Sequence, residues 1–150
     1  MKQIILLSSV ILLSFSLYAQ DNSYIKGNVS QILSGNEFVI LDSSQNEITI
    51  TLIDTKTVEV SEVSKKVIEY LNDRILNKEI YFSIERVDDT KILGSLLYNC
   101  EAMDNMTFEE NEIPCTSGKV LNIELIKLRY LKYIGSNDFL KKISEGEDPW

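Results

Sequence analysis

The feature that most constrains the fold is a short segment in which apolar and polar residues alternate before a single carboxylate. Residues 48–52 read Ile-Thr-Ile-Thr-Leu, and Asp54 follows one position later. Alternation with a period of two predicts a strand with one buried and one polar face. The segment therefore predicts a half-buried strand that presents Asp54 at the turn after it.

Two further strands are predicted before this segment. Residues 24–32 and 38–41 are rich in Tyr, Ile, Val and Phe, and the polar stretches 34–36 and 42–46 follow them. Runs of β-branched and aromatic residues bounded by Gly, Asn, Asp and Ser predict strands joined by turns. We therefore expect a three-stranded meander, which is how an OB-fold begins.

The period of the apolar residues changes after residue 58. Apolar residues there lie three or four positions apart, at Val60, Val63, Val67, Leu71 and Ile75. This spacing predicts an amphipathic helix, with Ser61 as its N-cap. Residues 80–84 alternate again and predict a fourth strand, and residues 93–98 predict a fifth.

The C-terminal third is predicted to be helical. Residues 120–131 carry leucines at helical spacing, and Ser136-Asn137-Asp138 is predicted to cap a third, short helix that contains Phe139 and Ile143. The predicted fold class is α+β, a five-stranded OB-fold β-barrel with an inserted helix and two C-terminal helices. A chain of 150 residues is long enough for one such domain, which we place at residues 21–150.

The first 20 residues differ in character from the rest of the chain. Lys2 gives a short basic start, residues 4–17 are apolar or small, and Ala19 offers a cleavage point ahead of Asp21. This arrangement is typical of a secretory signal peptide. The apolar run is shorter than the roughly 20 residues that a membrane-spanning helix needs. We therefore expect export to the periplasm, the cell envelope or the exterior, with no transmembrane span in the mature chain.

The chain is acidic, with 15 basic and 23 acidic residues and a net charge of −8. Loss of residues 1–20 would remove one basic residue and no acidic one. Proteins that hold nucleic acid through its phosphates normally present clustered Lys and Arg. The charge therefore disfavours nucleic acid and favours a protein or cell-envelope partner, although a local basic groove would reverse the sign at one site.

Cys100 and Cys115 are the only cysteines, and an exported chain meets an oxidising compartment. A disulfide is favoured over free thiols or a metal site, because zinc usually takes four ligands and the chain has no histidine. The bond would tie the base of an acidic loop, residues 99–116, which has five acidic residues and no basic one. Three interpretations of this loop stay open: a solvated surface, a weak cation site, and a surface that captures a partner protein.

The absence of histidine also limits the possible chemistry. Ser-His-Asp and Cys-His arrangements cannot be formed, and no histidine can act as a general base. Any catalysis would depend on carboxylates, Lys, Arg, Tyr or a bound metal.

Four short segments carry a resemblance to a known family. They are residues 34–38 (Ser-Gly-Asn-Glu-Phe), 52–55 (Leu-Ile-Asp-Thr), 93–98 (Leu-Gly-Ser-Leu-Leu-Tyr) and 118–122 (Gly-Lys-Val-Leu-Asn). In this order and at these spacings the chain resembles the thermonuclease, or staphylococcal nuclease-like, family over about residues 25–143. The resemblance implies a calcium-dependent phosphodiesterase site. Two aspartates would hold the cation, a glutamate would assist the attacking water, and two arginines would stabilise charge on the phosphate.

The resemblance assigns these roles to five positions, of which one keeps the family residue. Asp54 stands at the second aspartate, and Asn36 stands at the first, where it keeps an oxygen but loses the charge. Thr49 and Leu93 stand where the arginines are expected. Thr57 stands at the position of the glutamate. Asp54 is also open to a second interpretation, as a turn residue that caps the following helix.

Glu59, Lys56 and Lys91 are the near neighbours that offer substitute charges. Lysine is a point charge that lacks the bidentate geometry of arginine, so these are weak replacements. We therefore expect a divergent thermonuclease-like protein that has lost nuclease catalysis and acts as a binding module. The alternative is a weak calcium-dependent nuclease of DNA or RNA, with Asp54 and Asn36 as metal ligands.

Overall fold

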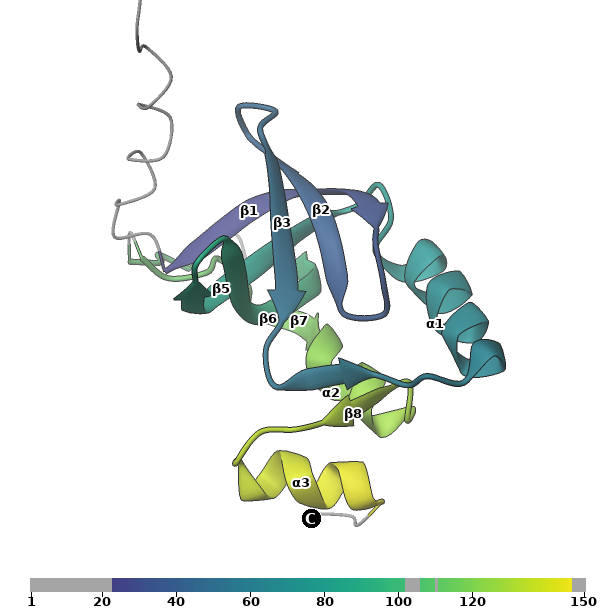
Figure 1. Ribbon diagram of the computed structural model, residues 1–150. Helices are drawn as coiled ribbons and strands as arrows, with labels where there is room; N and C mark the ends of the chain where they lie inside the picture. The colour runs from purple at the N-terminus through teal and green to yellow at the C-terminus, as the bar shows by residue number, and fades with distance from the viewer. Residues whose placement is uncertain (1–22, 102–105, 110, 147–150) are drawn as a thin grey trace, which may run out of the picture.

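Five strands form a closed barrel in the computed structural model, which describes residues 23–101, 106–109 and 111–146 (Figure 1). The strands are β1 (Tyr24–Ile32), β2 (Glu37–Asp42), β3 (Glu47–Leu52), β5 (Glu79–Asp88) and β6 (Lys91–Glu101). Their order is β3-β2-β1-β5-β6, and a further pairing between β3 and β6 closes the ring. The closing pair is parallel and joins Ile50 to Ile92 and Leu52 to Gly94. The predicted fold class is confirmed.

The alternating segment packs as predicted. Ile48, Ile50 and Leu52 are buried while Thr49 is exposed. Phe38 and Ile40 of β2 are fully buried in the same core cluster. Each such side chain contributes about 1.5–3 kcal/mol through its removal from water, so the period-two pattern supplies the interior of the barrel.

Gly94 lies at a close approach between β5 and β6. A Cβ atom on this residue would be 1.8 Å from the carbonyl oxygen of Ser83. The register between β5 and β6 shifts nearby, between Ile84 and Arg86. At the seam, where β3 pairs with β6 and closes the barrel, the amide of Ile53 donates to the carbonyl oxygen of Gly94 at 2.9 Å. The lack of a Cβ atom at Gly94 therefore allows the close approach of β5, and its carbonyl oxygen takes part in closing the barrel.

Helix α1 (Ser61–Arg74) lies between β4 (Thr55–Thr57) and β5 in the chain, on one side of the barrel (Figure 1). It buries Val67 and Leu71, as the spacing predicted. The prediction that Ser61 is the N-cap is wrong, because extended Val60 takes that place and no side chain caps the helix. The prediction of Asp54 as its cap is wrong for the same reason. Ser64 instead donates its hydroxyl to the carbonyl oxygens of Val58 and Val60.

The second predicted helix is shorter than expected. Helix α2 spans Leu121–Lys127, and Arg129 then takes a left-handed conformation with φ 59°. Leu128 is the C-cap of α2, and its side chain is exposed. Leu131 belongs to strand β8 (Leu131–Tyr133), which pairs with β4. The spacing of Leu131 suits a helix, but its pairing with Thr57 buries it in a strand.

The remaining C-terminal elements are strand β7 (Ser117–Val120), which extends the sheet beside β6, and helix α3 (Asp138–Glu145). The predicted cap of α3 is confirmed, since the Asn137 side chain accepts hydrogen bonds from the amides of Phe139 and Leu140. Strands β4, β7 and β8 were not anticipated, because each has only three or four residues.

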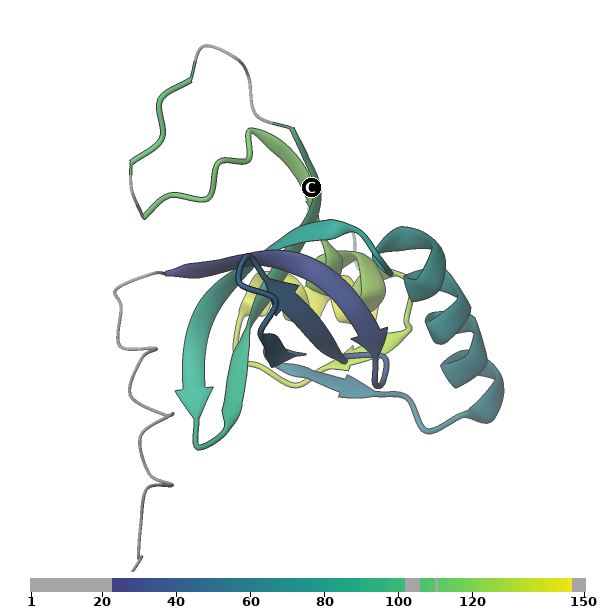
Figure 2. The ribbon, with the colours of Figure 1, turned by 90° about the horizontal axis from the view of Figure 1, so that it is seen from above.

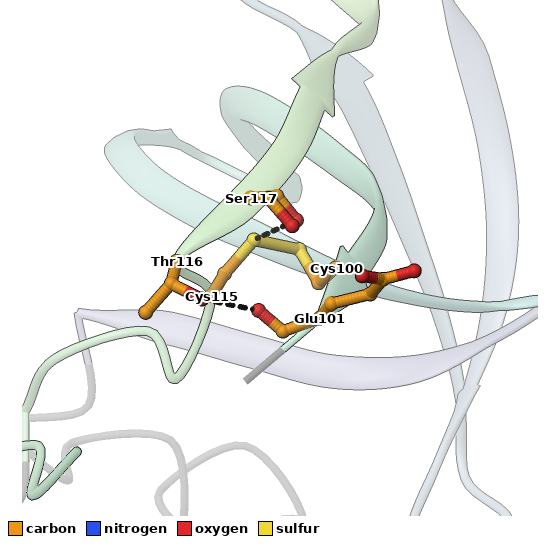
Figure 3. Close-up of a disulfide and its surroundings, with 5 residues drawn as sticks. All are labelled: Cys100, Glu101, Cys115, Thr116 and Ser117. Atoms are coloured by element: carbon orange, nitrogen blue, oxygen red, sulfur yellow. Dashed lines mark hydrogen bonds between the residues drawn. A yellow bond between two sulfur atoms is a disulfide. The ribbon is translucent and has the colours of Figure 1, made fainter. Parts of the chain in front are cut away.

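The disulfide between Cys100 and Cys115 is confirmed (Figure 3). It joins β6 to the residues just before β7, and next to it Thr116 donates its hydroxyl and its amide to the carbonyl oxygen of Glu101. The described part of the acidic loop lies to one side of the barrel, away from α1 (Figure 2). Asp104 and Glu110 of this loop, and the predicted signal peptide at residues 1–20, lie outside the described residues.

Loss of the disulfide should lower the free energy of unfolding by about 3 kcal/mol, because the bond closes a loop of 15 positions in the unfolded chain. The test compares urea unfolding of the mature protein with that of the double variant Cys100→Ser/Cys115→Ser. A reductant should produce the same loss in the wild type and none in the variant. An unchanged wild-type midpoint under reducing conditions would contradict the prediction.

Candidate functional site

The turn between β1 and β2 lies against the corner between β3 and β4. The amide of Leu52 donates to the carbonyl oxygen of Asn36 at 2.8 Å. The side chain of Asn36 then reaches Thr55 on the far side of the corner. Asn36 and the corner that contains Asp54, both assigned to the site from sequence, are therefore brought together by the fold.

The amide group of Asn36 is engaged in hydrogen bonds within the protein. Its Oδ1 accepts from the hydroxyl of Ser34 at 3.0 Å. Its Nδ2 donates to the carbonyl oxygen of Thr55 at 3.2 Å and also contacts Thr55 Oγ1 at 3.4 Å. A cation between Asn36 and Thr55 would need oxygen donors from both sides, whereas here an N–H group faces the Thr55 carbonyl. The donor set beside Asn36 therefore does not fit calcium in this arrangement.

Asp54 sits at the corner in a left-handed conformation, with φ 54°. Its carbonyl oxygen accepts from the amide of Ile134 at 2.9 Å, which joins the corner to the residues after β8. Its carboxylate lies against Gly135, where a Cβ atom would be 2.6 Å from Asp54 Oδ2 and 2.4 Å from the hydroxyl of Tyr133. The absence of a side chain at Gly135 makes room for this carboxylate.

The two positions expected for arginine carry no charge. Thr49 is exposed in the middle of β3, opposite Val39 of β2. Leu93 is half-buried on β6 and pairs with Thr51 of β3. Both belong to β3 and β6, the two strands whose parallel pairing closes the barrel. A hydroxyl and an alkyl group cannot neutralise charge that develops on a phosphate.

The remaining predicted residues lie on β4, on the link to α1 and at the start of β6. Thr57 ends β4 and is half-buried, and Glu59 is exposed in the link to α1. Lys56 lies on β4 opposite Lys132, and Lys91 begins β6 opposite Asp88. Within the described ranges, no salt bridge connects the Asp54 carboxylate to either lysine. The same residues contain no group of three or more His, Cys, Asp or Glu side chains that could hold a metal ion.

A groove of about 260 Å³ lies beside the candidate site, between the β1–β2 turn, the end of β4 and α1. Its wall includes Gly35, Thr57, Ser64, Val67 and Tyr130. No Asp, Glu, Lys or Arg lines it. The groove next to the glutamate position is therefore neutral.

A cluster that sequence reasoning missed joins α1, β6 and α2. Tyr70 and Tyr98 each donate a hydrogen bond to Glu124, to Oε1 and Oε2 respectively. The ring of Tyr130 packs edge to face on Tyr70 at 5.5 Å, and the Arg74 guanidinium lies 5.0 Å from the same ring. Burial, followed by the hydrogen bond to Glu124, raises the pKa of both tyrosines. These groups are far apart in sequence, so no local pattern reveals the cluster.

Asn122 is a buried polar residue whose structural role the sequence did not reveal. It is buried, its Oδ1 accepts from the amide of Leu96 at 3.1 Å, and its Nδ2 donates to the carbonyl oxygen of Gly94 at 3.2 Å. The first turn of α2 therefore satisfies β6 backbone groups next to the seam. The only sequence observation about Asn122 was that it ends segment 118–122, one of the four segments that carry the resemblance.

The fold and these contacts define a class of protein: a five-stranded mixed β-barrel with helices, consistent with an OB-fold. No protein-family model matches the sequence, and no curated protein matches it.

Proposed function

We propose that this chain is a divergent thermonuclease-like protein that has kept the barrel, lost phosphodiester hydrolysis, and acts as an exported binding module. The observation that carries the proposal is the environment of Asn36. Its amide bridges Ser34 and Thr55 with hydrogen bonds, so the position expected for an anionic calcium ligand serves to hold two turns together.

Replacement of the positive groups supports the same proposal. Removal of one group that stabilises transition-state charge typically lowers the rate by about 10²-fold or more. Thr49 and Leu93 occupy both arginine positions. The exposed Lys56 and Lys91 have no salt bridge to Asp54 among the described residues. Catalysis that depends on Asp54 alone would lack both the second anionic ligand and the paired cations.

The composition supports a protein or cell-envelope partner over nucleic acid. The net charge is −8, and nucleic-acid affinity depends largely on the release of counterions by clustered cations. No helix in the described part of the chain is long and apolar enough to cross a membrane.

A nuclease assay tests the proposal directly. The purified mature protein, with millimolar calcium, should hydrolyse neither DNA nor RNA above the level seen with a chelator. Asp54→Ala should behave like the wild type. Calcium-dependent hydrolysis that Asp54→Ala abolishes would instead support the alternative, a weak nuclease that uses Asp54 with Asn36, Glu59 and a lysine.

Asn36→Asp tests the resemblance separately from activity. Without calcium, the variant replaces N–H donors facing Thr55 with oxygen lone pairs, so its free energy of unfolding should fall by about 1–3 kcal/mol. Calcium should then raise the melting temperature of the variant but not that of the wild type, because a ligand stabilises the state that binds it. The double variant Asn36→Asp/Asp54→Asn is the control and should not respond. Absence of a calcium effect in Asn36→Asp would contradict the proposed descent from a calcium site.

A further inference from the structure

A second and larger groove lies between the β4–β8 ribbon and the two C-terminal helices. Its volume is about 510 Å³. Ile126, Leu131 and Tyr133 give it an apolar floor, and Arg129 and Lys132 give it cationic groups. The hydroxyl of Tyr133 accepts from the amide of Asn137 at 2.7 Å, which fixes the ring. We call this the C-terminal groove.

Within residues 23–101, 106–109 and 111–146, no salt bridge joins the cations of the C-terminal groove to an acidic side chain. Lys132 lies directly opposite Lys56 in the β4–β8 pair, and like charges at such positions destabilise a ribbon. Lys56, Arg129 and Lys132 are all exposed. The two salt bridges among the described residues, Lys26–Glu79 and Arg86–Asp88, lie elsewhere. An apolar groove whose cations form no salt bridge with the described residues fits a segment that is both acidic and aromatic.

The chain supplies such a segment at the edge of the groove. Ser144 and Glu145 of α3 line the groove, and the described chain ends one residue later at Gly146. A Cβ atom on Gly146 would be 2.9 Å from Arg129 Nη2. The next residues are Glu147, Asp148, Pro149 and Trp150. Four residues extend about 13 Å, and Pro149 lowers the entropic cost of ordering them.

We propose that residues 147–150 occupy the C-terminal groove as an intramolecular ligand. Glu147 and Asp148 pair with Arg129 and Lys132 and outweigh the charge of Glu145, and the Trp150 indole covers the apolar floor. The groove is then a recognition site for segments that combine acidic and aromatic residues, and residues 147–150 mask it. This inference is independent of the proposed loss of nuclease activity.

The fluorescence of Trp150 tests the proposal, because Trp150 is the only tryptophan in the chain. In the mature protein its emission should be blue-shifted relative to the unfolded protein in urea, and acrylamide should quench it less. Arg129→Glu/Lys132→Glu should shift the emission to the red and increase quenching. The matched control is Lys65→Glu/Lys66→Glu on α1, which makes the same charge change at two exposed lysines and should leave the emission unchanged.

Arg129 follows α2 and its guanidinium lies next to Gly146, the residue after α3, so a variant that does not alter the groove is also needed. Glu147→Lys/Asp148→Lys changes only the tail, and it should produce the same red shift with unchanged circular dichroism. Wild-type emission equal to that of the unfolded chain, or tail and groove variants that both leave it unchanged, would overturn the proposal. Emission that depends on protein concentration would also overturn it, because the tail would then occupy a second copy of the chain.

Discussion

Replacing Gly94 with alanine is expected to lower the free energy of unfolding by at least about 3 kcal/mol. The new methyl group would lie 1.8 Å from the Ser83 carbonyl oxygen and 2.9 Å from its carbon. Both are backbone atoms of β5, so relief requires β5 and β6 to separate. Separation would also disturb the hydrogen bond from Ile53 to Gly94 that closes the barrel. Urea unfolding followed by circular dichroism measures the loss.

Gly35→Ala is the matched control for this prediction. Its new methyl group would meet only side-chain atoms, at 3.1 Å from Val67 Cγ1 and 3.3 Å from Leu131 Cδ2. Side chains adjust more easily than backbone, so the loss should be smaller than for Gly94→Ala. If both variants unfold at the same urea concentration, the close approach of β5 to Gly94 does not limit stability.

Glu124→Leu is expected to lower the free energy of unfolding by about 2–4 kcal/mol, because hydrogen bonds to a charged group are strong and an unpaired buried hydroxyl is costly. The substitution would leave the hydroxyls of Tyr70 and Tyr98 without their acceptor. Tyr98 is 1% exposed, so water cannot readily replace Glu124 there. Glu124→Gln keeps an acceptor and nearly the same shape, and it should lose less. Equal stability of the leucine variant and the wild type would contradict this role.

The pH dependence of stability provides a second measurement of the same cluster. The folded state raises the pKa of Tyr70 and Tyr98 above the value of about 10 that tyrosine has in unfolded chains. The folded protein therefore holds these protons more tightly. The contribution of these raised pKa values to the free energy of unfolding is fully present below about pH 10, and it is lost as the pH rises further. Tyr98→Phe removes one of the two groups and should flatten that alkaline decline.

Much of the fold could be predicted because its signals are local. The alternation of apolar and polar residues over positions 48–52 predicts a half-buried strand without any knowledge of its partners. Asn137 caps α3 by accepting hydrogen bonds from amides two and three positions away. Leu131 was misassigned because its spacing suits a helix, whereas its pairing with Thr57 depends on a strand 74 positions away. The three-residue strands β4 and β8 are too short for a period to be recognised.

The proximity of the turns that carry Asn36 and Asp54 could be predicted from the sequence, but the hydrogen bonds of Asn36 could not. The sequence places Asn36 and Asp54 at the ends of neighbouring strands, and the fold brings the two turns together. That the Asn36 amide binds Thr55 depends on the conformation of both turns at once. The carboxylate of Glu124 likewise accepts hydrogen bonds from tyrosine hydroxyls that are 54 and 26 positions away in the sequence. Contacts of this kind follow from tertiary packing.

The parallel pairing of β3 with β6 also governs the order in which the molecule can assemble. The first three strands are consecutive and pair locally. The free edge of β3 stays unpaired until residues 92–94 arrive to cover it. Non-local pairing of this kind slows folding, and an uncovered edge strand invites association with other chains. A nascent chain that has been synthesised only as far as α1 therefore exposes an unpaired edge of β3 that promotes aggregation. This edge becomes paired once β6 has been synthesised.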